Sequence, residues 1–162
     1  MVFALFPDIG LRKQTENAFI AQFNLTSVNS ISAIEIIPPV KNYSDEELLK
    51  ILDQNKIDGV MVVALQDFWT TNVYIPPSFK TKGSASSFGN STFFESQTQQ
   101  YGGYHFSRPT AKFEIRLFDK KSSQVAWIAT STTKGDVFSD YNTLLKSLAK
   151  EVVKKLIKEK HH

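Results

Sequence analysis

The segment Ala111–Thr133 constrains the fold of this chain more than any other part of the sequence. Apolar and polar residues alternate over Lys112–Phe118, which predicts a strand with one buried face. The polar stretch Asp119–Gln124 predicts a turn, and Val125–Thr133 returns as a second extended run. The pattern therefore predicts two neighbouring strands joined by a turn.

An amphipathic helix is predicted directly after these strands, beginning near Ser139 or Asp140. Its apolar residues recur at helical spacing and predict one buried stripe, formed by Leu144, Leu145, Leu148, Ala149, Val152, Val153, Leu156 and Ile157. The other face carries Lys146, Lys150, Lys154, Lys155 and Lys158. We interpret this lysine face as solvated, and contact with nucleic acid or anionic lipid is the alternative.

The rest of the chain predicts a single α+β domain over residues 1–160. Ser44–Glu47 matches a capping box at the start of a helix, and Val60–Asp67 reads as a central strand. With 162 residues and 41% hydrophobic content, the chain can bury one core. We expect a mixed sheet of four to five strands with about three helices packed on it, the last being the carboxyl-terminal amphipathic helix. Residues 78–92 are expected to form a mobile loop, and residues 161–162 resemble a tag remnant.

The sequence offers no recognisable catalytic, cofactor or metal site. Apart from the tail, His105 is the only histidine, and the chain contains no cysteine. The carboxylates of Asp45–Glu47 fall in the first turn of a predicted helix, where they offset its dipole. Gly102–Gly103 lacks the pattern of a phosphate-binding loop and more simply predicts a turn. We therefore expect a protein that is not an enzyme and binds no cofactor or metal.

Charge and hydropathy narrow the expected location and partners. The longest apolar run, Val60–Leu65, is far shorter than the roughly 20 residues of a membrane-spanning helix. The first residues lack the pattern of a secretory signal, so the sequence as given would be cytoplasmic. A net charge of +3 is mild, and we expect no nucleic-acid partner.

One polar segment is unusually rich in aromatic residues. They are Phe88, Phe93, Phe94, Tyr101, Tyr104 and Phe106. Aromatic side chains in loops often contact a partner or ligand, which makes these six the candidate contact residues. The alternative is that they fold back and cover the sheet, because large apolar groups seldom stay exposed on a monomer.

Four segments resemble one family. They are Ile57–Val60, Tyr101–Tyr104, the strand–turn–strand with Leu117–Asp119 and Val125–Trp127, and the helix after it. Together, from Asp45 to the end, they resemble small bacterial envelope lipoproteins of uncharacterised function. The resemblance implies an α/β fold like the amino-terminal domain of TolB. It also implies a periplasmic protein that is membrane-anchored in its full-length form. The lipid anchor, on a cysteine, would then belong to a leader absent from this sequence.

Two functions are consistent with these observations. The first is a non-enzymatic domain that binds another envelope component, with a protein as the expected partner, through the aromatic loop or an exposed sheet edge. The alternative is a small-ligand or lipid carrier whose pocket lies between the aromatic loop and the sheet, near Trp69 or Trp127. The oligomeric state and the physiological process are not encoded in any motif.

Overall fold

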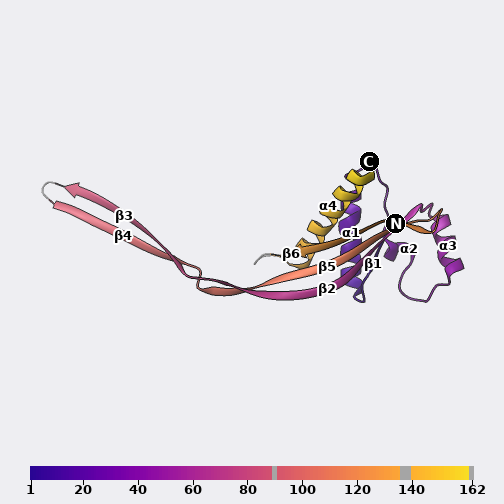
Figure 1. Cartoon of the computed structure of the whole chain (residues 1–162), viewed down its shortest axis with the longest axis horizontal. Coiled ribbons are helices and arrows are strands. Elements are labelled where there is room, and N and C mark those ends of the chain that lie inside the picture. Colours follow the sequence, from indigo (N-terminus) through magenta and orange to yellow (C-terminus); the bar gives the residue numbers. More distant parts are fainter. Residues whose placement is uncertain (89–90, 136–139, 161–162) are drawn as a thin grey trace. The chain divides into compact units, whose positions relative to one another are not determined.

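The computed structural model describes residues 1–88, 91–135 and 140–160 (Figure 1). The chain divides into two compact units. The first combines Met1–Trp69 with Pro109–His162, and the second is Thr70–Arg108. Strands β2 (Gly59–Ile75) and β5 (Tyr104–Asp119) contribute residues to both units.

The first unit contains a four-stranded sheet with the strand order β1-β2-β5-β6. β1 (Val2–Leu5) pairs in parallel with β2, whereas β5 pairs antiparallel with β6 (Gln124–Lys134). β2 and β5 also run in opposite directions, because the carbonyl of Asp58, just before β2, accepts a 2.9 Å hydrogen bond from the N–H of Lys120, just after β5. The sheet is thus mixed, and the expected α+β fold class is confirmed.

Three helices connect β1 to β2, as a parallel pair requires a long crossover. They are α1 (Ile9–Phe23), the single turn α2 (Ala33–Ile36) and α3 (Asp45–Gln54). The predicted capping box is present at the start of α3. Ser44 Oγ accepts a hydrogen bond from the Glu47 N–H at 3.2 Å, and Glu47 Oε2 accepts one from the Ser44 N–H at 3.0 Å.

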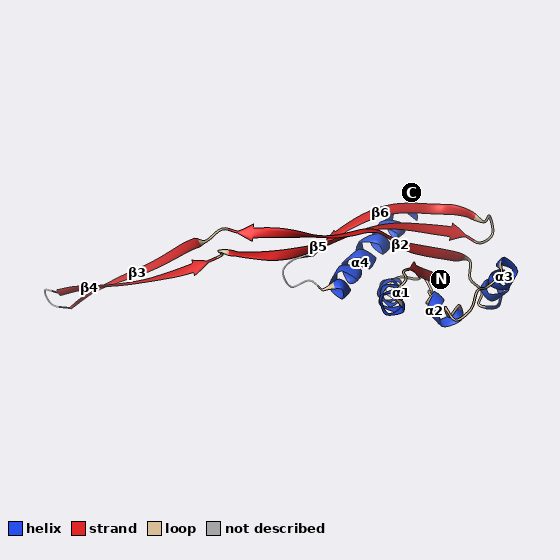
Figure 2. Ribbon diagram, turned by 90° about the horizontal axis from the view of Figure 1, so that it is seen from below, coloured by secondary structure: helices blue, strands red, loops and turns tan. Residues whose placement is uncertain are grey.

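The hydrophobic core lies between the sheet and two helices, α1 and α4 (Tyr141–Lys160), which lie on one side of the sheet (Figure 2). In β5, Phe113 and Ile115 are fully buried, whereas Lys112, which directly precedes Phe113, is exposed. The predicted alternation of buried and exposed residues is therefore confirmed. The stripe of α4 is also confirmed. Its most deeply buried members are Leu144, Leu145, Leu148, Ala149, Val152 and Val153.

The second unit contains a two-stranded antiparallel ribbon where the sequence predicts a loop. β3 (Ser78–Phe88) pairs with β4 (Ser91–Tyr101) along their whole lengths, and residues 89–90 between them lie outside the described part of the chain. The loop prediction for residues 78–92 is therefore wrong for the described residues. The sequence pattern did not predict these strands because ladder hydrogen bonds join backbone groups and require no apolar alternation. All the described side chains of the ribbon are exposed.

Candidate binding sites

Two of the six candidate aromatics flank a tight turn in the second unit. Tyr101 ends β4, Tyr104 begins β5, and each side chain is 50% exposed. Tyr101 OH donates a 2.6 Å hydrogen bond to Gln99 Oε1, and Lys80 Nζ lies 5.8 Å from the centre of the Tyr101 ring. At these two positions the exposure favours the contact interpretation over burial against a sheet.

The turn between the two tyrosines depends on its glycines. Gly102 and Gly103 have φ angles of +83° and +75°, a region that side chains with a Cβ rarely adopt. The Gly103 N–H donates a 2.7 Å hydrogen bond to the Ile75 carbonyl, and a Cβ on Gly102 would lie 2.2 Å from the Pro76 carbonyl oxygen. The predicted turn is confirmed, and it fixes the backbone on which both tyrosines stand.

The other candidate aromatics belong to the same unit. Phe106 is half-buried, with the Arg108 guanidinium 5.7 Å from its ring centre. The backbone places Phe88 at the end of β3 and both Phe93 and Phe94 on β4, while their side chains lie outside the described part of the structure. The sequence reasoning missed two further exposed aromatics of this unit, Phe79 and Tyr74, which are 65% and 51% exposed.

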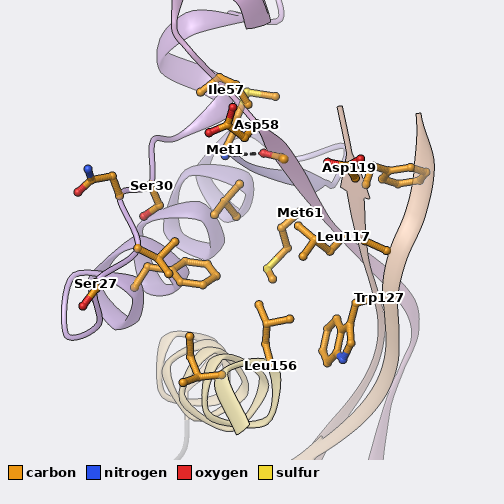
Figure 3. Close-up of a pocket in the computed structure, with 18 of the residues that line it drawn as sticks. Met1, Ser27, Ser30, Ile57, Asp58, Met61, Leu117, Asp119, Trp127 and Leu156 are labelled. Atoms are coloured by element: carbon orange, nitrogen blue, oxygen red, sulfur yellow. Dashed lines mark hydrogen bonds between the residues drawn. The ribbon is translucent and has the colours of Figure 1, made fainter. Parts of the chain in front are cut away.

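A separate hollow of about 820 Å³ lies in the first unit (Figure 3). Met61, Leu117, Trp127 and Leu156 lie around its interior and form an apolar lining, so β2, β5, β6 and α4 all contribute to it. Its volume falls within the range typical of small-molecule sites. None of the six candidate aromatics is among the described residues that line it, so this hollow is not the pocket expected beside the aromatic loop.

The rim of the hollow is polar and mainly acidic. The charged residues among its lining are Lys56, Asp58, Asp119 and Glu159. Trp127 Nε1 donates a 2.5 Å hydrogen bond to Glu159 Oε2, which orients the indole. Hydrogen bonds from the hydroxyl and N–H of Ser122 lower the pKa of Asp119 below its ordinary value, so this carboxylate stays ionised. An apolar interior with a charged rim suits an amphipathic molecule.

The described residues offer little for other kinds of site. No three histidine, aspartate or glutamate side chains in residues 1–88, 91–135 and 140–160 lie close enough together to hold a metal ion. His105, the single histidine before the tail, is exposed, and its ring centre lies 4.7 Å from that of Tyr74. Among the helices in the described ranges, none is long and apolar enough to cross a membrane.

Comparison with known proteins gives only distant structural neighbours. No protein-family model and no curated protein sequence matches the chain. The PelC dodecamer of Paraburkholderia phytofirmans is similar at 14% sequence identity, with a TM-score of 0.45 over 94% of this chain and 79% of that chain. A point variant of the same dodecamer is similar at 16% identity, with the same TM-score and coverage.

Proposed function

We propose that this chain is a non-enzymatic domain that binds a protein of the bacterial cell envelope through the exposed aromatic residues of its second unit. The observation that carries the proposal is the pair of half-exposed tyrosines, Tyr101 and Tyr104, on a turn whose backbone is fixed by two glycines. Tyrosine is enriched at protein interfaces because it buries a large area and retains a polar end. A periplasmic location with a lipid anchor in the full-length protein rests on the family resemblance.

The test is to replace Tyr101, Tyr104 and Phe106 together with alanine. We expect capture of the partner from envelope extract by purified, immobilised protein to fall at least about tenfold, because interface tyrosines often contribute more than about 1.4 kcal/mol each. The midpoint of thermal unfolding should move by less than about 4 °C, because Tyr101 and Tyr104 are 50% exposed and Phe106 is only half-buried.

The matched control removes exposed apolar side chains from the first unit. Leu25 and Val40 are 80% and 82% exposed, so replacing both with alanine should leave capture and unfolding unchanged. Capture that persists in the triple variant contradicts the proposal. A triple variant that fails to fold assigns the three aromatics to the core instead.

The hollow of the first unit favours a second function, the binding of a small amphipathic molecule. In a Trp69→Phe variant, Trp127 is the single tryptophan and lines the hollow. Titration with a single-chain zwitterionic lipid should shift its emission to shorter wavelength, because the acyl chain would displace water from the indole. Adding Leu156→Gln, in the lining, should weaken binding by about tenfold, whereas adding Leu25→Gln should not. Constant emission with lipid, glycan and peptide ligands alike contradicts this second function.

A further inference from the structure

β6 has the composition of a strand that can pair with another chain. It is the last strand in the sheet order, so one of its edges has no neighbouring strand in the described part of the chain (Figure 2). From Gln124 to Thr133 the strand contains no charged residue and no proline. Proteins usually place such residues on exposed edges to prevent pairing, and this edge has a charged residue only at its end, Lys134.

The hydrogen-bond register shows which backbone groups face outward. The Gly135 N–H donates to the Pro109 carbonyl at 2.8 Å, one residue beyond the pair Thr110↔Lys134. In an antiparallel ladder, hydrogen-bonded pairs recur at every second residue. Ala129, Ser131 and Thr133 therefore bond to β5, whereas the N–H and C=O groups of the intervening residues point away from it. These outward residues are Ile128, Thr130, Thr132 and Lys134.

A basic groove runs beside this edge. A hollow of about 300 Å³ lies between β6 and α4, and β6 contributes Ala129–Ser131 to its lining. From α4 the lining contains Glu151, Val152, Lys154, Lys155 and Lys158. This lining holds three lysines and one glutamate, so the groove has a net positive charge. Lys155 Nζ lies 3.9 Å from Glu159 Oε1, and both side chains are about half exposed. An extended segment on the edge of β6 would place every second side chain beside these lysines.

We propose that the outer edge of β6 and the lysines of α4 bind an extended acidic segment of a partner protein by strand addition. The inference rests on the proposed protein-binding function and names the chemistry of a second contact surface. Outward backbone groups of β6 would supply the ladder hydrogen bonds, and alternate side chains would supply specificity. Acidic residues would face α4, and the intervening apolar residues would lie beside Ile128, whose side chain is 56% exposed.

A synthetic peptide of about nine residues that alternates Glu and Val tests the proposal, since strands of this length are typical. We expect it to bind, as measured by fluorescence anisotropy, at least about tenfold more tightly than a peptide of the same composition with all Glu residues before all Val residues. Hydrogen exchange at the Thr130 and Thr132 amides should slow when the alternating peptide is present. Equal binding of the two peptides, or unchanged exchange, overturns strand addition.

Two sets of variants separate the backbone and charge contributions. Thr130→Pro removes an outward N–H and no ladder bond to β5, and proline is tolerated at such edge positions. Lys154→Glu with Lys158→Glu reverses the groove charge without touching β6. Each should weaken binding of the alternating peptide at least about tenfold, whereas Lys146→Glu, on an exposed part of α4 outside the groove lining, should change it less than about twofold.

Three further outcomes distinguish the β6 surface from other sites and from the proposed function. Binding of anionic vesicles or duplex DNA that depends on Lys154 and Lys158, without binding of the peptide, overturns the proposal in favour of a phosphate-binding face. The peptide assay uses no native partner, so it is independent of the capture assay. If the peptide does not bind while capture still depends on the aromatic residues, this inference alone is overturned. If the aromatic substitutions leave capture unchanged and the peptide still binds, the result supports the β6 surface and contradicts the proposed function.

Discussion

Replacing Glu16 with alanine is expected to destabilise the fold by about 3–5 kcal/mol, the range observed when one partner of a buried ion pair is removed. Since small domains are stable by only about 5–15 kcal/mol, this single substitution would remove a large share of the stability. The measurement is the free energy of unfolding from chemical denaturation followed by circular dichroism.

The size of the effect follows from the contacts of the Glu16 carboxylate, which is fully buried. Oε1 accepts 3.0 Å hydrogen bonds from Arg12 Nε and from the Ala4 N–H. Oε2 accepts a 2.9 Å hydrogen bond from the Ile34 N–H and a short one from the Ser32 hydroxyl. One side chain of α1 thus satisfies donors from β1 and from the first turn of α2. Alanine would leave these donors, and the Arg12 guanidinium, buried without an acceptor.

Two comparisons test this account of Glu16. Glu46→Ala removes an exposed glutamate of α3 and should change stability by less than about 0.5 kcal/mol. Arg12→Met combined with Glu16→Leu should cost less than the two single substitutions together, because the double variant buries no unpaired charge. If Glu16→Ala costs no more than Glu46→Ala, the carboxylate does not hold these elements together.

Glu16 also shows what sequence patterns cannot reveal. Its helix position is polar, and periodicity alone assigns a polar residue to the solvent side. Of its hydrogen-bond partners, Arg12 lies one turn earlier in α1. The others, Ala4, Ser32 and Ile34, are 12 to 18 residues away in the sequence. The sequence analysis expected a pocket near Trp69 or Trp127, but it placed that pocket beside the aromatic loop, because the lining of the hollow around Trp127 comes from segments that only the fold brings together.

Features set by local periodicity were predicted correctly. The alternation in Lys112–Phe118 and the apolar stripe Leu144–Ile157 each identify a buried face without knowledge of the partner element. The ribbon β3–β4 was misread because its serines, glycine and threonines carry no such periodicity. The candidate tyrosines were found by composition, while the edge of β6 required the strand order. Burial against a core therefore produces a periodic pattern of apolar residues in the sequence, whereas pairing of exposed backbone does not.

Ending the chain after Thr143 is expected to abolish folding. The shortened chain loses five large side chains that are at most 4% exposed: Leu144, Leu145, Leu148, Val152 and Val153. At about 1.5–3 kcal/mol for each buried aliphatic side chain, the loss is roughly 8–15 kcal/mol. This matches or exceeds the whole stability of a typical small domain. Phe113 and Phe19, which are fully buried in the same core, would also become exposed to water. Circular dichroism should show no cooperative thermal transition.

The matched control ends the chain after Lys158. It removes Glu159, and with it the hydrogen bond from Trp127 Nε1, which is exposed and should contribute less than about 1 kcal/mol. This chain should unfold cooperatively at nearly the original temperature and keep its buried stripe. A cooperative transition in the chain that ends at Thr143 would contradict the account, because the sheet and α1 would then form a stable core without α4.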